Sequence, residues 1–127
     1  MKKKILIIDD DQDILDLTEF LLQEIGYKVV ASLTANILDD VLQVNPDLIL
    51  LDDWLESTSG HQLCKVLKTE QATKHIPVVI FSASTGLEKI AKDCFADDYI
   101  NKPFDINYLQ DVIADLLQST SKASLNQ

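Results

Sequence analysis

Five short apolar runs, separated by segments of helical periodicity, constrain the fold of this 127-residue chain more than any other feature. Each run has the length and continuous apolar character of a buried strand, whereas the segments between them space apolar residues three and four positions apart, as amphipathic helices do. Parallel strands need crossover connections, and helices on both faces give a doubly wound α/β sheet. The expected strands are residues 5–8, 27–31, 48–51, 76–81 and 98–100.

Residues with strong local preferences mark the ends of several predicted helices. Asp11 directly precedes the first helix, where a carboxylate can cap it, and Gly26 stands where that helix should end. The residues from Gln118 onward are polar and aperiodic, so we expect residues 1–118 to form the domain and 119–127 to be a polar tail or the start of a linker. Helices are expected near residues 14–25, 37–42, 63–67, 87–95 and 106–117.

The composition is that of a soluble single domain. With 46% apolar residues the chain can bury a sizeable core, and we expect Cys64 and Cys94, which lack CxxC spacing, to be buried free thiols. A formal charge of -10 argues against a phosphate-neutralising surface for nucleic acid. No apolar run is long enough to span a membrane, and no signal-peptide pattern follows the first lysines, so we expect a cytoplasmic protein.

Acidic residues end two of the predicted strands. Asp9 and Asp10 follow the first strand, and Asp52 follows the third. Because open α/β sheets bind ligands outside the carboxyl ends of their strands, these carboxylates are expected to converge, and their mutual repulsion favours a bound cation. Oxygen ligands select Mg2+, Ca2+ or Mn2+ rather than zinc, and Mg2+ typically combines one or two carboxylates with waters and a phosphate. The sequence therefore predicts a Mg2+ site, with Mn2+ as an alternative ion.

Two later strand ends supply further groups that phosphoryl chemistry needs. Ser82 offers a hydroxyl after the fourth strand, and Lys102 offers an ammonium after the fifth. Taken singly, the motifs have simpler interpretations. The Asp9-Asp10 pair could be an acidic helix cap, and Lys102 could lie in a turn. Together at one sheet edge, they would position and neutralise a phosphoryl group on an aspartate nucleophile.

Four motifs follow one another in the chain: Ile7-Ile8-Asp9-Asp10-Asp11, Leu50-Leu51-Asp52, Ser82-Ala83 and Asp97-Asp98-Tyr99-Ile100-Asn101-Lys102-Pro103-Phe104. In this order they resemble the receiver domain of two-component response regulators, the CheY-like family, over residues 3 to about 118. The resemblance implies a flavodoxin-like (βα)5 fold with strand order 2-1-3-4-5. It also implies a signalling switch rather than an enzyme, apart from slow self-catalysed phosphorylation and dephosphorylation of the receiver aspartate.

The resemblance implies a role for each site residue. Asp52 would accept a phosphoryl group from a sensor histidine kinase or a histidine phosphotransfer protein. Ser82 and Lys102 would contact the phosphoryl oxygens, and Tyr99 would change rotamer as Ser82 rearranges, with core packing as the alternative role for that ring. A downstream protein would read the switch, without direct nucleic-acid binding or membrane insertion by this domain. The Mg2+ ligands would be Asp9, Asp10, Asp52 and the backbone carbonyl of Trp54.

The segment after the acceptor departs from the family pattern. Receivers usually have Met-Pro there, whereas this chain has Leu55-Glu56, although Gly60 falls where the family places a glycine. Trp54 is expected to lengthen the lifetime of the phosphoryl group by excluding water, with loop packing as the alternative. Asp53 is expected to be a solvated acid rather than a second acceptor.

A second departure lies before the fifth strand. Phe95 replaces a glycine that commonly precedes Ala-Asp-Asp, and the interval from Ser82 to Lys102 is slightly shorter than is typical. Both changes predict a displaced fourth helix.

Three other interpretations compete with a complete receiver. An aspartyl phosphatase of the haloacid dehalogenase type wants Thr or Val where this chain has Asp13, and a flavin-binding domain wants a phosphate loop where Asp9, Asp10 and Asp11 would repel the phosphate. The third alternative remains open: a receiver cut from a longer regulator with a DNA-binding or enzymatic domain.

Overall fold

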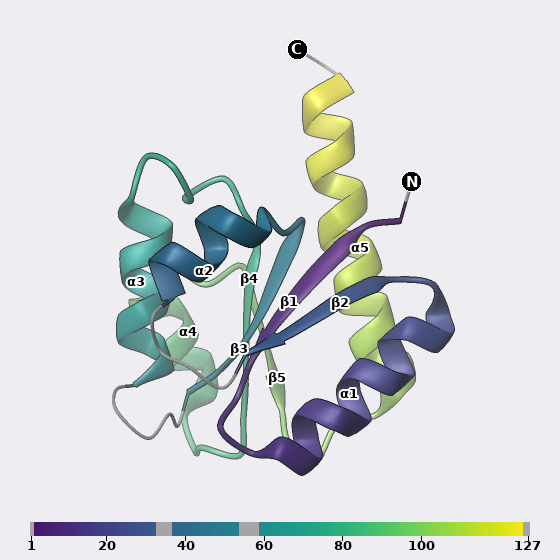
Figure 1. Cartoon of the computed structure of the whole chain (residues 1–127). Coiled ribbons are helices and arrows are strands. Elements are labelled where there is room, and N and C mark those ends of the chain that lie inside the picture. The colour runs from purple at the N-terminus through teal and green to yellow at the C-terminus, as the bar shows by residue number, and fades with distance from the viewer. Residues whose placement is uncertain (1, 33–36, 54–58, 126–127) are drawn as a thin grey trace.

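The computed structural model describes residues 2–32, 37–53 and 59–125. Its strands form one parallel sheet in the order β2-β1-β3-β4-β5, which confirms the doubly wound fold and the expected order 2-1-3-4-5 (Figure 1). The buried central strands are continuous apolar runs, as a sheet covered on both faces requires. The strands are β1 Lys4–Ile8, β2 Lys28–Ser32, β3 Leu48–Asp52, β4 Val78–Ser82 and β5 Asp98–Asn101.

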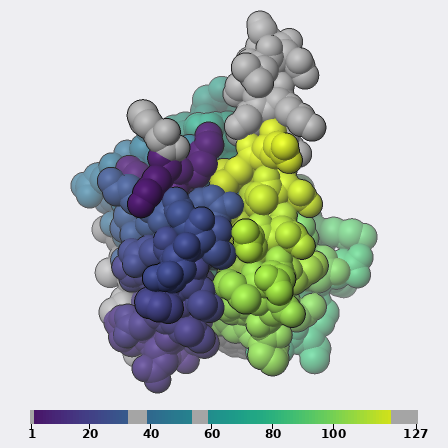
Figure 2. Space-filling view, turned by 90° about the vertical axis from the view of Figure 1, so that its right-hand side faces the viewer, coloured from purple at the N-terminus to yellow at the C-terminus, as the bar shows by residue number. Residues whose placement is uncertain are grey.

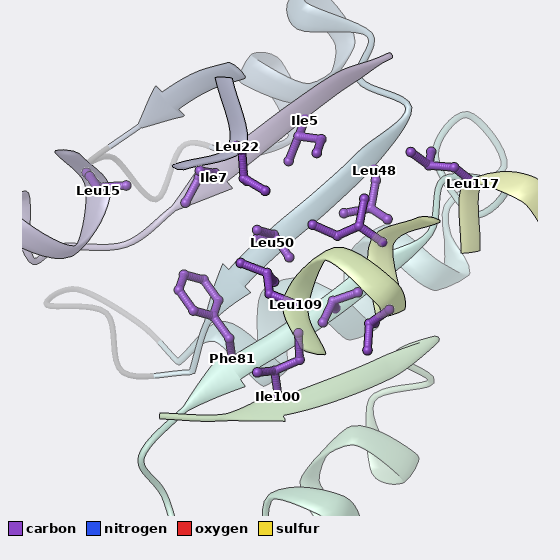
Figure 3. Packing of buried hydrophobic residues seen from close by; sticks show 13 residues of the cluster. Ile5, Ile7, Leu15, Leu22, Leu48, Leu50, Phe81, Ile100, Leu109 and Leu117 are labelled. Carbon is purple, nitrogen blue, oxygen red and sulfur yellow. The ribbon is translucent and has the colours of Figure 1, made fainter. Parts of the chain in front are cut away.

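Helices cover both faces of the sheet and pack on separate cores. α1 and α5 pack on one face against Ile5, Ile7 and Phe81, as the first cluster of buried residues shows (Figure 3). α2, α3 and α4 pack on the other face, where Leu6 and Ile8 point because successive side chains of a strand alternate between faces. The helices are α1 Gln12–Ile25, α2 Ile37–Val44, α3 Gly60–Thr69, α4 Leu87–Asp93 and α5 Ile106–Leu125.

The ends of α1 confirm the expected signals. The side chain of Asp11 accepts hydrogen bonds from the backbone N–H groups of Asp13 and Ile14, which would otherwise lack partners at the helix start. Gly26 adopts the left-handed conformation, with a φ of 119°, and its N–H donates to the last turn of the helix. The first helix is therefore fixed at both ends by local chemistry.

The last helix is longer than the sequence predicts. Its periodic apolar face ends near Leu117, but α5 continues to Leu125. No glycine or proline interrupts residues 118–125, and serine and threonine only mildly disfavour a helix, so nothing stops it at the end of the apolar face. Figure 2 shows α5, green to yellow, beside the blue α1 on one face of the molecule. Among the described residues, no helix is long and apolar enough to cross a bilayer.

Both cysteines are buried free thiols, as expected. The thiol of Cys64, on α3, donates to the carbonyl of Cys94, which follows α4, at 3.4 Å. The neighbouring thiol of Cys94 and burial both raise the pKa of Cys64. This pair joins α3 to α4 in the second core and is not accessible as a nucleophile.

Phe95 occupies a backbone position that favours glycine. Its φ is 65°, in the left-handed region that side chains with a β-carbon disfavour. The N–H of the next residue, Ala96, donates to the carbonyl of Ala91 at 2.9 Å, which closes a Schellman turn after α4. A glycine would make this turn without the steric cost. The displacement of α4 that the sequence suggests stays a prediction.

Replacing Phe95 with glycine is expected to raise the free energy of unfolding by about 1 kcal/mol, because the left-handed conformation then costs nothing. The ring is 55% exposed, so its removal sacrifices little burial. Phe95→Ala is the matched control, since alanine loses the ring but keeps the β-carbon. Denaturant unfolding followed by circular dichroism measures both variants, and an equal gain for alanine would contradict this explanation.

Candidate functional site

Three carboxylates meet at the carboxyl ends of the central strands. Asp9 follows β1 and Asp52 is the last residue of β3, so the pairing of these two strands brings them to the same edge. Each of Asp9, Asp10 and Asp52 offers an oxygen within 4.8 Å of the others. Asp9 and Asp52 are buried, at 1% and 7% exposure, where water screens their repulsion poorly. The expected convergence of the three acids is confirmed.

Lys102 provides the positive charge of this cluster. Its Nζ lies 2.8 Å from Oδ2 of Asp9 and 3.4 Å from Oδ1 of Asp52. The same ammonium lies 4.5 Å from the centre of the Phe81 ring, a favourable cation–π contact. Lys102 follows β5 and precedes Pro103 through a cis peptide bond. One lysine nevertheless leaves three neighbouring carboxylates with excess negative charge.

Asp10 shows that the donor set suits a hard cation. Its Oδ1 is buried and has no hydrogen-bond partner among the described residues. A buried oxygen without a hydrogen-bond partner lowers the free energy of unfolding by about 1–3 kcal/mol. Oδ1 of Asp9 is already occupied by the N–H of Asp11, at 2.9 Å, which orients that carboxylate. An oriented ligand and an unpaired buried oxygen together form an arrangement that could hold a metal ion.

Ser82 and Tyr99 lie on the strands beside this cluster. Ser82 is fully buried at the end of β4, and its Oγ lies 2.9 Å from Oγ of Ser84. Its backbone carbonyl accepts from the N–H of Lys102, at 2.9 Å, so the ends of β4 and β5 are tied together. Tyr99 is half-buried on β5 and packs against the second core, and the negative charge of Glu88 on α4 raises its pKa. Both residues therefore lie where the sequence places them.

Gly60 lies directly against the peptide of Asp52. A β-carbon at this position would lie 2.8 Å from the carbonyl carbon of Asp52 and closer still to the carbonyl oxygen. The N–H of Gly60 also donates to the carbonyl of Asp53, at 2.7 Å. A glycine is required here because the start of α3 touches the backbone of Asp52. Trp54, Leu55 and Glu56 lie outside the described residues, so the expected carbonyl ligand and water exclusion by Trp54 stay predictions.

Asp53 is not the solvated acid that its sequence position suggests. It is only 4% exposed, and its Oδ1 accepts hydrogen bonds from the backbone N–H and from Nδ1 of His61, at 3.1 and 2.8 Å. The prediction of a solvated side chain was wrong because these two donors hold the carboxylate inside. His61 was not predicted at all, since no local pattern links it to Asp53.

A model of the response regulator receiver domain matches residues 5–114. The chain belongs to this family of receiver domains. It is 36% identical over 124 residues to the DNA-binding dual master transcriptional regulator RpaA of Synechocystis, covering 94% of the chain and 51% of that protein. It is 38% identical over 109 residues to the phosphate regulon transcriptional regulatory protein PhoB of Klebsiella pneumoniae, covering 82% of the chain and 47% of that protein. The receiver thus spans about half the length of these curated relatives.

Solved receivers share the architecture. A CheY-like receiver domain protein from Methanospirillum hungatei superimposes with a TM-score of 0.88 at 28% identity, over 97% of this chain and 99% of the other. NtrX from Brucella abortus matches with a TM-score of 0.85 at 28% identity, over 99% of this chain and 30% of NtrX. The receiver fold therefore occurs both as nearly the whole of a solved chain and as one part of a longer one.

Proposed function

We propose that this receiver domain is a phosphorylation-dependent switch in which Asp52 accepts the phosphoryl group. The observation that carries the proposal is the position of Asp52, at a strand end beside two further carboxylates and within 3.4 Å of the Lys102 ammonium. In the reaction, a carboxylate oxygen of Asp52 attacks phosphorus, and the bond from phosphorus to the donor breaks as the donor leaves. The product is an acyl phosphate, which carries more negative charge than the carboxylate it replaces.

Mg2+ is the cofactor that the acidic cluster fits best, with Mn2+ as the alternative. Asp9, Asp10 and Asp52 would hold the ion, together with the Trp54 carbonyl if the expectation from the sequence is right. A bound ion would neutralise charge on the carboxylates and on the phosphoryl oxygens. The unpaired oxygen of Asp10 supports this assignment, because binding would give it a partner.

Lys102 and Ser82 supply the remaining contacts in the proposal. Lys102 bridges Asp9 and Asp52, so its ammonium is already placed to neutralise a new oxyanion on Asp52. The Ser82 hydroxyl would turn toward a phosphoryl oxygen and leave its present contact with Ser84. Tyr99 would respond because it lies on the neighbouring strand β5, opposite Ile80 in register. This movement would carry the charge change at Asp52 to the surface.

Mg2+ is expected to stabilise the domain, by about 1.4 kcal/mol at ten times its dissociation constant. Asp10→Ala should be more stable than the wild type without metal, because it removes the unpaired buried oxygen, and should gain less from Mg2+. Thermal unfolding with and without Mg2+ measures both effects. An unchanged melting temperature of the wild type in millimolar Mg2+ would count against a metal site here.

The first test of the proposal is phosphorylation by a small donor. Incubation of the purified chain with acetyl phosphate and Mg2+ should add one phosphoryl group, visible by intact-mass spectrometry, and EDTA should prevent it. In the cell, the donor would be a sensor histidine kinase or a phosphotransfer protein, as for receivers generally. A chain that remains unlabelled at saturating donor and Mg2+ would refute the proposal.

The relatives suggest an output for the switch. RpaA and PhoB are described as transcriptional regulators, and the receiver spans about half of each. A receiver joined to a DNA-binding domain is therefore the second candidate arrangement, in which α5 would lead toward the output domain. The full reading frame decides between this arrangement and a single-domain switch.

A further inference from the structure

The start of α3 is capped by a side chain from outside the helix. Ser59 occupies the N-cap position but makes no side-chain capping bond. The Oδ1 of Asp53 accepts the N–H of His61 instead, at 3.1 Å. The first N–H groups of a helix lack partners within it, and an ionised carboxylate is a strong acceptor for them. Asp53, the residue after the acceptor, therefore holds the first turn of α3.

The side chain of His61 makes a second contact with the same carboxylate. Its Nδ1 lies 2.8 Å from Oδ1 of Asp53, within reach of a hydrogen bond from an imidazole N–H to a carboxylate oxygen. The Oγ of Ser59 lies 3.4 Å from the other ring nitrogen, Nε2. The Asp53 side chain is 6% exposed and that of His61 is 46% exposed, so the contact has a buried carboxylate and a more open imidazole. We call the contacts between Asp53 and residues Gly60 and His61 the Asp53 clasp.

The Asp53 clasp fixes the backbone of the acceptor. It joins residues on either side of the interval 54–58, Asp53 before it and Gly60 and His61 after it. The N–H of Gly60 donates to the Asp53 carbonyl, and Gly60 itself packs against the Asp52 peptide. Releasing His61 would therefore loosen α3 from the backbone that carries Asp52.

The Asp53 clasp also borders the region expected to move. Asp53, Ser59 and His61 line a cleft of about 290 Å³ together with Ser84 and Thr85. Ser84 in turn contacts Ser82, both through its N–H, at 3.2 Å, and through its hydroxyl. The clasp thus shares this cleft with the segment that follows Ser82. An ordinary helix cap needs only one short polar side chain. Here the buried carboxylate of Asp53, next to Asp52, is contacted by both the backbone N–H and Nδ1 of His61.

We propose that His61 and Asp53 are positioning residues, which hold the Asp52 carboxylate in the geometry that binds Mg2+ and accepts the phosphoryl group. This inference rests on the proposed function. Groups that orient a metal ligand from behind commonly change metal affinity or activity by about 10–100-fold when they are removed. His61 touches neither the metal site nor the phosphoryl group directly, and it acts through Asp53 and the Asp52 backbone.

The test compares three variants of the full chain. His61→Ala should raise the Mg2+ dissociation constant, measured by calorimetry, by about ten-fold, and should slow labelling by acetyl phosphate at saturating Mg2+. His61→Asn should keep the Mg2+ dissociation constant and the labelling rate close to those of the wild type, because the Asn amide can donate from nearly the position of Nδ1. Thr69→Ala is the matched control at the other end of α3. Among the described residues, its hydroxyl bonds only to the carbonyls of Lys65 and Val66, so the dissociation constant and the labelling rate should both stay unchanged.

A second set of variants tests whether the two residues act as one unit. Asp53→Asn keeps an oxygen for the His61 N–H but loses the charge, so it should weaken Mg2+ binding less than His61→Ala does. If the two residues act through each other, Mg2+ should bind the double variant, Asp53→Asn with His61→Ala, no more weakly than it binds His61→Ala alone. Fully multiplicative effects would contradict a shared clasp.

The outcomes separate this inference from the proposed function. If the wild type is labelled but His61→Ala matches it in Mg2+ affinity and labelling rate, the positioning role is wrong and the proposed function stands. Equal losses in His61→Ala and Thr69→Ala would show that only helix stability matters, which also overturns the inference. If the wild type neither binds Mg2+ nor accepts the phosphoryl group, the proposed function fails first and the inference falls with it.

Discussion

Gly60→Ala is expected to lower the free energy of unfolding by about 3 kcal/mol, because the new methyl group would overlap the backbone of Asp52. The colliding atoms belong to the end of β3 and not to a flexible side chain, so the structure can relieve the overlap only by moving α3 or the acceptor strand. Denaturant unfolding followed by circular dichroism measures the loss. The slope of the free energy of unfolding against denaturant concentration should match that of the wild type if both proteins unfold in two states.

Gly26→Ala is the matched control for this prediction. Gly26 has a φ of 119°, but no atom of the described residues lies within 4 Å of a β-carbon built there, so alanine meets backbone strain without a collision. We expect a loss of about 1 kcal/mol from the left-handed conformation alone. A loss in Gly60→Ala no larger than in Gly26→Ala would contradict the close packing of α3 on the acceptor strand.

The two glycine variants should also differ in their rate of labelling by acetyl phosphate. The Gly60 collision displaces the Asp52 peptide, so Gly60→Ala should be labelled by acetyl phosphate more slowly even under conditions where it is fully folded. Gly26 caps α1 far along the chain from the acceptor, and Gly26→Ala should be labelled at the wild-type rate. Comparable labelling of both variants would show that the acceptor tolerates the shift.

The sequence predicts the sheet and the acidic cluster because both depend on local patterns. Continuous apolar runs such as 48–51, bounded by turn residues, are typical of strands buried on both faces, and parallel pairing then brings their carboxyl ends to one edge. Asp9 and Asp52 therefore converge through topology alone. The positions of Ser82 and Lys102 are predictable for the same reason, since Ser82 ends β4 and Lys102 directly follows β5 of the same sheet.

The surroundings of Asp52 could not be predicted in this way. The burial of Asp53 depends on His61, eight residues away, and no periodicity or cap pattern relates the two positions. The left-handed conformation of Phe95 is also hidden, because a bulky residue at that position is contrary to local preference. The extension of α5 to Leu125 reflects the absence of a stop signal, which a search for apolar periodicity does not detect.

The central claim is that Asp52 is the residue that receives the phosphoryl group. Asp52→Asn keeps the size of the side chain and an oxygen near Lys102, but an amide cannot form the acyl phosphate. Intact-mass spectrometry after incubation with acetyl phosphate and Mg2+ measures the outcome directly, with the wild type run in parallel. The proposal predicts one added phosphoryl group on the wild type and none on Asp52→Asn. Labelling of the variant to the wild-type extent would place the acceptor elsewhere and contradict it.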